Sequence, residues 1–531
     1  MIIDLQSGAP EGLPQDAICV IGAGAVGLCI AVSLARRGVP VVLLEGGGQT
    51  METDAQALQE GRSVGHPFTN IEVGRYRVLG GSTVFWGGQV LPFDRFVRDA
   101  RPWLGHDAWP IADAELDPYF AKTYELLGLG EAFFDDKEVW RGIGVPFPEF
   151  GPELEVQFTR WLRTRNLALL FKKELKQFDK LITVLHANVC AFNLSEDQRS
   201  VRSVSVKSLN GKQFEFAAKS FVLANGTLEM SRLLLHPLGN GATPAWQRSK
   251  HLGTPMIDHL DCLAGDVHIL DHDAMHSVFD NIYFKSHKYY PRIRLAPDVQ
   301  REQGLVDISA QFLYRTRFSE HLEYLKMFLR SIKEGAAPVS VLQLPRHLTA
   351  VAKTALPLAV RYFKDRRSFK PDDAEVSLAL YCEQLPTPRS RLELGDERDA
   401  LGMRRLRVNW QIDGREIKTM KYFSLRIKQQ LESRKIASVA LNPLLLDEDP
   451  KFIEAIHDGI HQMGAARIGR TAQDGVVDAD LKVFGTDNLY LGGAAVFPST
   501  GFANPTFTAI ALALRLADHL DAKERRATVS H

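Results

Sequence analysis

The sequence predicts an α/β protein that combines a Rossmann-like nucleotide-binding domain with a second domain built on an antiparallel sheet and helices. Three observations predict this class. A strand–turn–helix–strand pattern near the start carries Gly-x-Gly-x-x-Gly at residues 22–27. Runs that alternate between polar and apolar residues recur between residues 260 and 454, which is typical of antiparallel strands. A glycine-rich block at residues 461–506 ends directly before an apolar helical pattern.

The composition is that of a globular protein with a large core, since 45% of the 531 residues are apolar and 24% are charged. Lys plus Arg and Asp plus Glu both number 64, so the charge balance gives no reason to expect nucleic acid as a partner. The five cysteines are scattered without a CxxC pair, which argues against a disulfide framework or a metal site. Because the N-terminal stretch has neither the basic nor the apolar region of a signal peptide, we expect a cytoplasmic protein.

The first element is a complete βαβ unit. A β-rich run over residues 17–21 leads into GAGAVG, a helical pattern closed by Gly38 follows, and a second strand ends at Glu45. In this motif the glycines permit a tight turn, close approach to a pyrophosphate and close helix–strand packing, while the terminal acid accepts a ribose hydroxyl. An ordinary glycine-rich turn is the alternative, and the motif does not distinguish FAD from NAD. We assign cofactor contacts here to Gly22, Gly24, Ala25, Gly27 and Glu45.

A second glycine-rich segment spans residues 75–92 and reads RYRVLGGSTVFWGGQVLP. Glycines add no side-chain bulk, so such a backbone can lie flat against a planar ring. Arg77 can meet a phosphate with two parallel hydrogen bonds. A glycine-rich surface loop is the alternative. We assign cofactor contacts in this segment to Arg77, Gly81, Ser82 and Gly88.

The C-terminal block contains the candidate catalytic pair, His461 in HQMG and Asn504 in FANPT. The turns between them place an imidazole and an amide on two loops that can meet over one ligand. An alcohol proton is weakly acidic, so loss of a hydride from the same carbon is easier when a base of near-neutral pKa accepts that proton. An amide offers a donor and an acceptor and does not titrate. The alternatives are a core histidine at His461 and a helix N-cap at Asn504.

Together these elements resemble one family, the glucose–methanol–choline (GMC) flavoprotein oxidoreductases. The Gly-x-Gly-x-x-Gly unit, the LGGS…WGG loop, the VLANGTLEMSRLLL segment at residues 222–235 and the C-terminal block occur in the family's order. The resemblance covers most of the chain and implies a Rossmann-like FAD-binding domain of the GMC and p-hydroxybenzoate hydroxylase type. Within the family, YLGGAAVFPSTGFANPT is most similar to the pyranose oxidases and the large subunits of sugar and sugar-acid dehydrogenases.

The resemblance implies FAD that takes a hydride at N5 from a carbinol carbon, with His461 accepting the hydroxyl proton and Asn504 orienting the oxygen. Some members attach FAD through a histidine where this chain has Phe85, so the FAD is expected to be non-covalent. Many members have an aspartate at the position of Gly493, but the pyranose-oxidase-like branch has Gly-Gly there. Further cofactor contacts are assigned to Val189, Gly492, Gly493, Pro505 and Thr506.

The family order also implies that FAD-binding parts of the chain alternate with substrate-binding parts. The FAD-binding domain is expected to consist of residues 1–110, 180–260 and 455–531. Residues 111–179 connect it to the substrate domain, whose main part is 261–454. The cofactor site is therefore expected where the three FAD-binding parts meet.

Two pairs of polar residues border the predicted strands of the substrate domain. Glu383 and Gln384 end a strand and are candidate substrate contacts, with a solvated strand end as the alternative. Asp258 and His259 stand at a matching position of the family, where a structural role is expected ahead of a chemical one.

Residues 321–370 carry an unusual excess of positive charge. Ten lysines and arginines stand against three acids in this segment, although the whole chain is neutral. Apolar residues recur at helical spacing in HLEYLKMFLRSI and HLTAVAKTALPLAVRYF, which predicts an amphipathic basic helix pair. Such helices can lie on an anionic membrane surface or dock a partner. A solvated helical excursion that covers the active site is the alternative.

The sequence therefore predicts an FAD-dependent oxidoreductase that acts on a CH–OH group, with a sugar or glycoside hydroxyl favoured by the branch that it resembles. The electrons can pass to O2 or to another acceptor. The alternatives are a GMC dehydrogenase of a non-sugar alcohol, a non-redox flavoprotein of the hydroxynitrile lyase type, an NAD-dependent dehydrogenase and a non-catalytic flavoprotein module. The carbon oxidised and the oligomeric state are not readable from the sequence.

Overall fold

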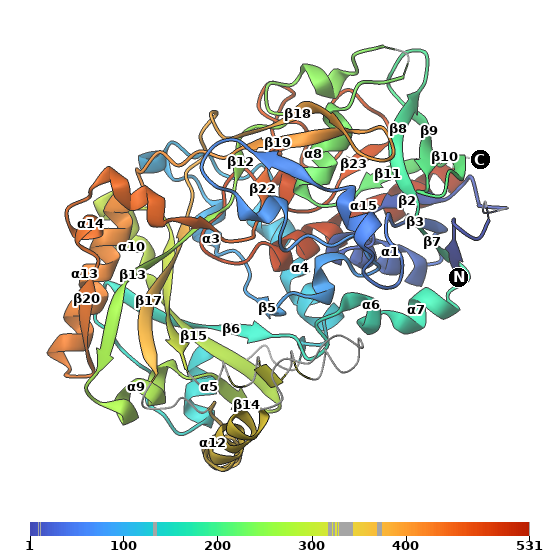
Figure 1. Cartoon of the computed structure of the whole chain (residues 1–531). Coiled ribbons are helices and arrows are strands. Elements are labelled where there is room, and N and C mark those ends of the chain that lie inside the picture. The colour runs from blue at the N-terminus through green and yellow to red at the C-terminus, as the bar shows by residue number, and fades with distance from the viewer. Residues whose placement is uncertain are drawn as a thin grey trace.

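A computed structural model gives the structure of this chain. The structure describes residues 1–8, 10, 12–130, 135–239, 241–316, 321, 324–325, 328, 343–368 and 374–529. Two large sheets dominate it, one parallel and one antiparallel, and Figure 1 shows them side by side. The predicted α/β class, with a Rossmann-like domain and a domain built on an antiparallel sheet, is confirmed.

The parallel sheet forms the nucleotide-binding half. Its strands run in the order β1 (Ile2–Asp4), β7 (Leu181–Leu185), β3 (Val41–Leu44), β2 (Ile18–Ile21), β11 (Ser220–Leu223) and β23 (Leu489–Leu491). Neighbouring strands pair in parallel. The strands from β3 to β23 are buried along their whole length and largely apolar, as expected for a parallel sheet that is covered on both faces.

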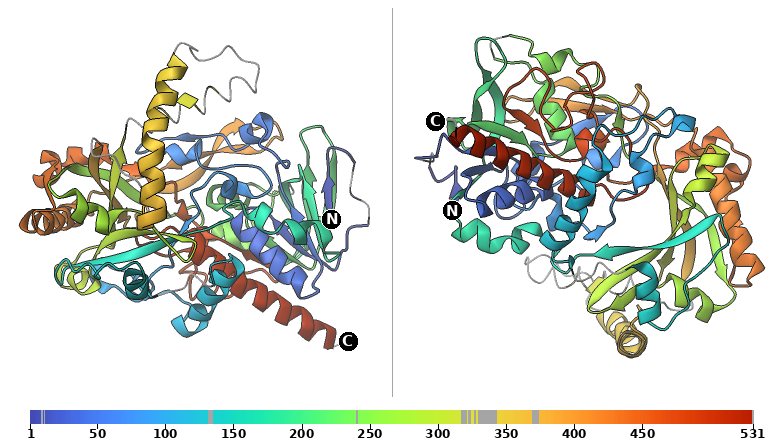
Figure 2. Two further views of the ribbon diagram at one scale, coloured as in Figure 1. Left: turned by 90° about the horizontal axis from the view of Figure 1, so that it is seen from below. Right: turned by 180° about the vertical axis from the view of Figure 1, so that it is seen from behind.

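Helices α1 (Ala25–Arg36) and α15 (Thr506–Val529) pack against each other beside this sheet. Figure 2 (right) shows the red helix α15 running along the blue elements of the N-terminal unit. Helix α1 begins directly after Gly24, so its unpaired backbone N–H groups lie at the carboxyl end of β2. The first and last long helices of the described chain therefore lie side by side.

The antiparallel sheet has the order β20 (Ala437–Leu441), β13 (His259–Ile269), β17 (Glu375–Glu383), β16 (Ile308–Arg315), β15 (His287–Leu295), β6 (Leu154–Trp161) and β5 (Gln89–Val90). Strands β14 (Ile282–Phe284) and β21 (His457–Asp458) pair with β15 and β13. One face joins a hydrophobic core with α13 (Ile417–Ser433), through alternate residues such as Leu260, Leu380 and Phe312. Because side chains alternate along a strand, the residues between them lie on the opposite face.

Three smaller strand pairings complete the framework. The first is the antiparallel sheet of β8 (Asn188–Leu194), β9 (Val201–Lys207) and β10 (Gln213–Ala217). The second contains β18 (Arg391–Arg398), β19 (Arg404–Asn409) and β4 (Gly61–Ser63). The third joins β12 (Met256–Ile257) to β22 (Met463–Gly464), and it brings the His461 loop beside the start of β13.

Further helices link these sheets. They are α2 (Thr53–Ala57), α3 (Arg95–Arg98), α4 (Asp113–Leu126), α5 (Asp136–Gly142), α6 (Leu167–Leu170), α7 (Lys172–Gln177), α8 (Thr227–Leu235), α9 (His272–Phe279), α10 (Pro297–Gln303) and α14 (Pro443–Leu446). Strand β6 lies within residues 111–179 and β5 within residues 1–110, yet both are strands of the antiparallel sheet. The predicted domain boundaries stay a prediction.

The basic segment contributes one long described helix, α12 (Leu344–Asp365), which extends away from the body of the molecule in Figure 2 (left). The basic residues outside the described residues are Lys326, Arg330, Lys333 and Lys370. Exposed apolar side chains on α12 include Leu348 and Phe363. Among the helices in the described ranges, none has the length and apolar character needed to cross a membrane. The predicted membrane or partner contact of this segment stays a prediction.

Candidate functional site

A cleft opens at the carboxyl ends of the parallel strands and is bordered by all three segments that the sequence singled out. Its lining includes most of the assigned cofactor residues, namely Gly22, Gly24, Ala25, Glu45, Arg77, Gly81, Ser82, Val189, Gly492, Gly493, Pro505 and Thr506. His461 lines the same cleft. Gly27 and Gly88 are assigned residues that do not line it. The parts of the chain predicted to build one cofactor site therefore lie together.

Each glycine of the first turn has a different structural role. Gly22 has φ of 100°, and a Cβ there would lie 2.6 Å from Cα of Asn225. A Cβ on Gly27 would lie 1.8 Å from the carbonyl oxygen of Gly22, so this glycine lets α1 pack against the turn. A Cβ on Gly24 would meet no protein atom within 4 Å, and Gly24 lines the cleft. The turn thus leaves open space beside the N-terminus of α1, where backbone N–H groups favour an anion.

Glu45 closes the first βαβ unit and supports the glycine turn. Its Oε2 accepts a hydrogen bond of 2.8 Å from the backbone N–H of Ala23, and its Oε1 accepts one of 2.9 Å from Gly47. Burial raises the pKa of Glu45, and the backbone donors and the charge of Arg77 oppose that shift. The carboxyl group lines the cleft at the end of β3. The predicted contact with a ribose hydroxyl stays a prediction.

The second glycine-rich loop lies directly behind the first. A Cβ on Gly81, which has φ of 54°, would approach Cα of Gly24 to 2.8 Å. The hydroxyl of Ser82 donates a hydrogen bond of 2.7 Å to the carbonyl of Gly74, which fixes the loop. Gly88 has φ of 77°, and a Cβ there would lie 2.5 Å from the side chain of Arg165, so this glycine serves packing away from the cleft. The two glycine-rich loops can approach this closely because neither Gly24 nor Gly81 carries a side chain.

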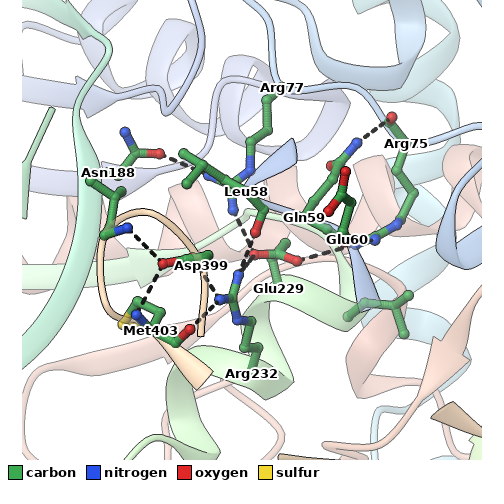
Figure 3. Close-up of polar contacts among 12 residues, drawn as sticks. Leu58, Gln59, Glu60, Arg75, Arg77, Asn188, Glu229, Arg232, Asp399 and Met403 are labelled. Carbon is green, nitrogen blue, oxygen red and sulfur yellow. Dashed lines mark hydrogen bonds and ion pairs between the residues drawn. The ribbon is translucent and has the colours of Figure 1, made fainter. Parts of the chain in front are cut away.

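Arg77 belongs to an ion cluster that the sequence did not predict. Figure 3 shows three arginines around Glu229 on α8. Glu229 accepts from Arg77 at 2.6 Å, from Arg75 at 3.2 Å and from Arg232 at 3.3 Å. Burial disfavours the charged form of Glu229, but the three guanidinium groups outweigh it and lower its pKa to about 2. Arg77 also donates a 2.8 Å bond to Asn188.

This cluster lines one end of the cleft and carries a net positive charge. Arg232 also pairs with buried Asp399 at 2.6 Å, so three cations stand against two carboxylates. The predicted contact of Arg77 with a phosphate stays a prediction, because the structure pairs its guanidinium with a carboxylate. The one sequence signal for the cluster was Glu229 and Arg232, spaced three apart on one side of an otherwise apolar helix.

The loop that carries His461 is held by a buried carboxylate. Asp258 accepts hydrogen bonds from the backbone N–H groups of His259 at 2.7 Å, Gly459 at 3.0 Å and His461 at 3.0 Å. Burial, followed by the charge of Asp458, raises the pKa of Asp258 well above its usual value. Asp258 thus ties the start of β13 to a loop about 200 residues later, since three backbone donors converge on one side chain.

His461 pairs with His259 through their ring nitrogens. The two Nδ1 atoms are 3.1 Å apart, and the rings meet edge to face with centroids 4.9 Å apart. One of the two Nδ1 atoms must donate and the other accept, which leaves Nε2 of His461 for the cleft. Burial and then the charge of Arg292 lower the pKa of His461 to about 3. The imidazole of His461 is therefore neutral near pH 7 and has the form that a base requires.

Asn504 lies two residues before the start of α15 and is partly buried. Its side chain makes no hydrogen bond to any of the residues that the structure describes, so no helix-capping bond is formed from the amide there. The next two residues, Pro505 and Thr506, line the cleft with His461. The backbone of Gly501, on the same loop, lies beside His259, which contacts His461. The structure thus brings together the two loops that the sequence predicted to meet.

Glu383 and Gln384 do not line the cleft. Glu383 forms a pair of hydrogen bonds with Arg101, of 2.6 Å and 2.5 Å, and neither side chain is exposed. Gln384 accepts from the backbone N–H of Asp258 at 3.0 Å and from Trp410 at 2.9 Å. The alternative of a solvated strand end is wrong, because both side chains are buried. Their contacts support the framework that holds His461.

Removing the carboxylate of Glu383 is expected to destabilise the fold. The Glu383→Ala variant leaves Arg101 buried and unpaired, so the free energy of unfolding should fall by about 3–5 kcal/mol. Urea unfolding followed by circular dichroism measures this change. Glu393→Ala is the matched control, because it removes a partly exposed carboxylate that pairs with the exposed Arg391, and it should cost less than about 1 kcal/mol. Equal effects of the two substitutions would contradict the argument.

The C-terminal part of the chain matches a family model. Residues 386–513 match the model described as GMC oxidoreductase, and this range contains both candidate catalytic residues. Residues 386–513 are a GMC oxidoreductase domain. The predicted resemblance to GMC oxidoreductases is therefore confirmed, and the cleft described above is the cleft that this GMC domain shares with the N-terminal βαβ unit.

Three curated relatives match part of this chain. A C-glycoside 3-oxidase of Microbacterium trichothecenolyticum is 28% identical over 148 residues, which is 27% of this chain and 27% of that protein. A 2-methyl-1,2-propanediol dehydrogenase of Mycolicibacterium austroafricanum is 27% identical over 29% of this chain and 27% of its own length. A fructose dehydrogenase large subunit of Gluconobacter japonicus is 28% identical over 26% of this chain and 23% of its own length. Each match thus spans about a quarter of both proteins.

Solved structures resemble the chain over nearly its whole length. A formate oxidase has a TM-score of 0.56 with 15% identity and covers 96% of this chain and 99% of its own. A fungal aryl-alcohol oxidase has a TM-score of 0.56 with 13% identity, covering 97% and 100%. A pyridoxine 4-oxidase from Mesorbium loti has a TM-score of 0.52 with 17% identity, covering 95% and 99%. These likenesses show that the chain shares the fold of these oxidases over nearly its whole length.

The residues of the cleft fit FAD. The open space at Gly24 beside the N-terminus of α1 suits a pyrophosphate, and the carboxyl group of Glu45 stands at the end of β3, where a ribose is held in this fold. The side chain of Phe85 offers no nucleophile for a covalent link, and its ring packs against the ring of Tyr76 at a tilt, with centroids 4.3 Å apart. The lining therefore agrees with a non-covalently bound dinucleotide.

Proposed function

We propose that the chain is an FAD-dependent oxidoreductase that oxidises the CH–OH group of an alcohol. One observation carries this proposal: a neutral imidazole, His461, lines the same cleft as the glycine cradle of Gly24 and Gly81. When bound in this cleft, FAD supplies the acceptor for the hydride of the carbinol carbon. The curated relatives, which are named as oxidases and dehydrogenases of hydroxyl compounds, support the same reaction class.

In this proposal the residues of the chain handle the substrate oxygen and its proton. Nε2 of His461 accepts the hydroxyl proton as the hydride leaves, and Asp258 and His259 hold the imidazole in place. The amide of Asn504, which has no hydrogen-bond partner among the described residues, binds the same oxygen and orients it. The substrate is proposed to be a sugar or glycoside, because two of the relatives are named for a glycoside and a sugar. A non-sugar alcohol, as in the diol dehydrogenase, is the competing class.

The visible spectrum of the purified protein under anaerobic conditions tests this proposal. A sugar, a glycoside or a simple alcohol that bleaches the oxidised flavin supports it and names the substrate class. Admission of air then shows whether O2 accepts the electrons. A flavin that no alcohol bleaches contradicts the oxidation reaction and favours the non-redox lyase, and a protein without a flavin spectrum excludes both.

The rate of flavin reduction is expected to change little as the pH falls from about 8 to about 5. Burial and the charge of Arg292 lower the pKa of His461 to about 3, below the ordinary value for histidine. The neutral, proton-accepting form therefore persists across this range and is lost only as the pH approaches the lowered pKa. Stopped-flow reduction at saturating substrate measures the profile. A tenfold loss for each pH unit below about pH 6.5 would indicate an ordinary histidine and refute this reasoning.

A further inference from the structure

The face of the antiparallel sheet that lies away from α13 is polar near the catalytic loop. Asp261 on β13 stands opposite Tyr381 on β17, and Tyr381 stands opposite Ser309 on β16. On β15, Arg294 stands opposite Ser309, and Arg292 lies two residues earlier on the same face of the strand. The row therefore crosses four strands and begins two residues from His259.

Arg292 is a buried cation without a carboxylate partner. Its residue exposure is 3%, and among the residues that the structure describes it forms no ion pair. One guanidinium nitrogen lies 3.4 Å from the hydroxyl of Ser309, the Nε atom has no hydrogen-bond partner, and the group lies over the ring of Tyr381 at 4.5 Å. Five N–H donors are thus left with one weak acceptor.

Other buried arginines on the same side of the molecule are compensated. Arg294, which lies two residues after Arg292 on β15, pairs with Asp94 at 2.6 Å. Arg101 pairs with Glu383, and both side chains are fully buried. An uncompensated buried charge costs several kcal/mol, so proteins retain one where it has a use. Arg292 is the exception in this set, which indicates that a ligand supplies its partner.

The position of Arg292 relative to the proposed base indicates that its ligand is the substrate. Its charge acts on both His461 and His259, so the guanidinium lies close to the histidine pair. Asp261 is the carboxylate nearest to this site in register, and its Oδ1 has no hydrogen-bond partner. A Cβ on Gly459 would lie 3.1 Å from that Oδ1 and 3.2 Å from Nδ1 of His461, so Asp261 borders the catalytic loop.

The polar face is also accessible. Leu263 on β13 and Leu313 on β16 lie on the same side of their strands as Asp261 and Ser309, and they are 46% and 41% exposed. Tyr381 and Asp261, which flank the guanidinium, are also partly exposed. A ligand can therefore reach this polar row beside the proposed base, although Arg292 itself is only 3% exposed.

We infer that Arg292, with Tyr381 and Asp261, forms a subsite for the carboxylate of an acidic alcohol, such as a sugar acid, whose hydroxyl carbon is oxidised at His461. This inference rests on the proposed function. The planar fork of an arginine matches a carboxylate with two parallel hydrogen bonds, and Asp261 accepts a hydroxyl of the same molecule. Neutral hydroxyl groups alone need no uncompensated cation, because neutral donors and acceptors bind them equally well.

The first test compares an acid with its neutral counterpart. Anaerobic flavin reduction is measured with D-glucuronate and D-glucose, and the ratio of rate constant to dissociation constant is expected to be at least about tenfold higher for the acid. Arg292→Gln should remove this preference, because the ratio of rate constant to dissociation constant should fall about 10–100-fold more for the acid than for glucose. Arg292→Lys keeps the charge but loses the fork, so it should retain part of the preference.

The second test measures binding without turnover. Cyclohexanecarboxylate and cyclohexanecarboxamide share one ring and differ in charge, and their binding to the flavin-loaded protein is followed by calorimetry and by perturbation of the flavin spectrum. The acid should bind the wild type at least about tenfold more tightly than the amide, and Arg292→Gln should abolish the difference. Arg315→Gln is the matched control, because it removes an exposed charge from the far end of β16 and should leave the binding of both ligands unchanged.

The outcomes separate this inference from the proposed function. Neutral alcohols that bleach the flavin as well as acids do, together with equal binding of the acid and the amide, overturn the carboxylate subsite and leave the oxidation reaction standing. A flavin that neither class bleaches overturns the proposed function itself. Because Arg292→Gln removes an unpaired buried charge, its melting temperature should be equal to or above that of the wild type. A variant that unfolds more easily would show a structural role instead.

Discussion

Replacing His461 with alanine is expected to slow flavin reduction by about 10²–10⁴-fold, while the flavin stays bound. The substitution removes the neutral imidazole whose Nε2 accepts the hydroxyl proton, and no other histidine lines the cleft in the described chain. The glycine cradle and α1 are untouched, so cofactor binding should persist. Anaerobic stopped-flow mixing with the best substrate of the wild type measures the rate, and the ratio of absorbance at 450 nm to that at 280 nm, roughly constant if flavin is retained, measures its content.

A histidine on the same framework provides the control for this substitution. His268 lies exposed near the far end of β13, the strand that begins with His259, so His268→Ala should leave the rate unchanged. Asn504→Ala should slow reduction less than His461→Ala does, since an amide that orients the oxygen accepts no proton. Flavin reduction at the wild-type rate in His461→Ala would remove this residue from the mechanism.

Gly24→Val is expected to abolish FAD binding without unfolding the protein. The Cβ position of Gly24 meets no protein atom within 4 Å, so the fold itself tolerates a side chain there. The same position opens into the cleft beside the N-terminus of α1, where a branched side chain fills the space for the pyrophosphate. The purified variant should be colourless and should not regain absorbance on dialysis against FAD, while its far-ultraviolet circular dichroism matches that of the wild-type apoprotein.

Gly239→Val is the matched control for the cofactor prediction. This glycine also has no protein atom within 4 Å of its Cβ position, but it does not line the cleft. The control should bind FAD as the wild type does. A yellow Gly24→Val protein with the wild-type flavin content would move the pyrophosphate away from the first glycine turn and would contradict the assignment.

The sequence predicted the local parts of the site well because those parts are encoded by short-range patterns. Gly27 is required by a contact inside the turn, Gly22 by its contact with Asn225 beside the end of β11, and Gly24 leaves open space, so the pattern Gly-x-Gly-x-x-Gly reports the local shape of the turn. The role of Glu45 was predictable because this acid ends the second strand of the βαβ unit. His461 and Asn504 were identified because each belongs to a glycine-rich motif, and the structure places their loops at one cleft.

The partnerships between distant residues were not predictable in the same way. Asp258 meets the backbone of His461 about 200 residues later, and Glu229 meets Arg77 about 150 residues earlier. No periodicity in the sequence encodes such pairs, since they depend on which strands become neighbours. Glu383 illustrates the resulting error: the end of a strand was expected to be solvated or to face substrate, but Arg101 meets it in the interior.

The basic segment marks a further limit of sequence reasoning. Its helical spacing predicted amphipathic helices, and α12 is a long helix with exposed apolar side chains. Charge and periodicity alone do not select between a membrane surface, a protein partner and a solvated cover. The charge excess also includes residues outside the described ranges, so the helix α12 carries only part of the pattern that suggested the contact.

The order of the strands in the parallel sheet has a consequence for biosynthesis. The edge strand β23 and the helix α15 come from residues 489–529, yet they pair with β11 and α1 from the first half of the chain. During synthesis on the ribosome, strand β11 therefore keeps one edge unpaired, and the cleft lacks the side formed by residues 492–509, until this stretch emerges. The cofactor can meet its complete site only after nearly the whole chain has been synthesised.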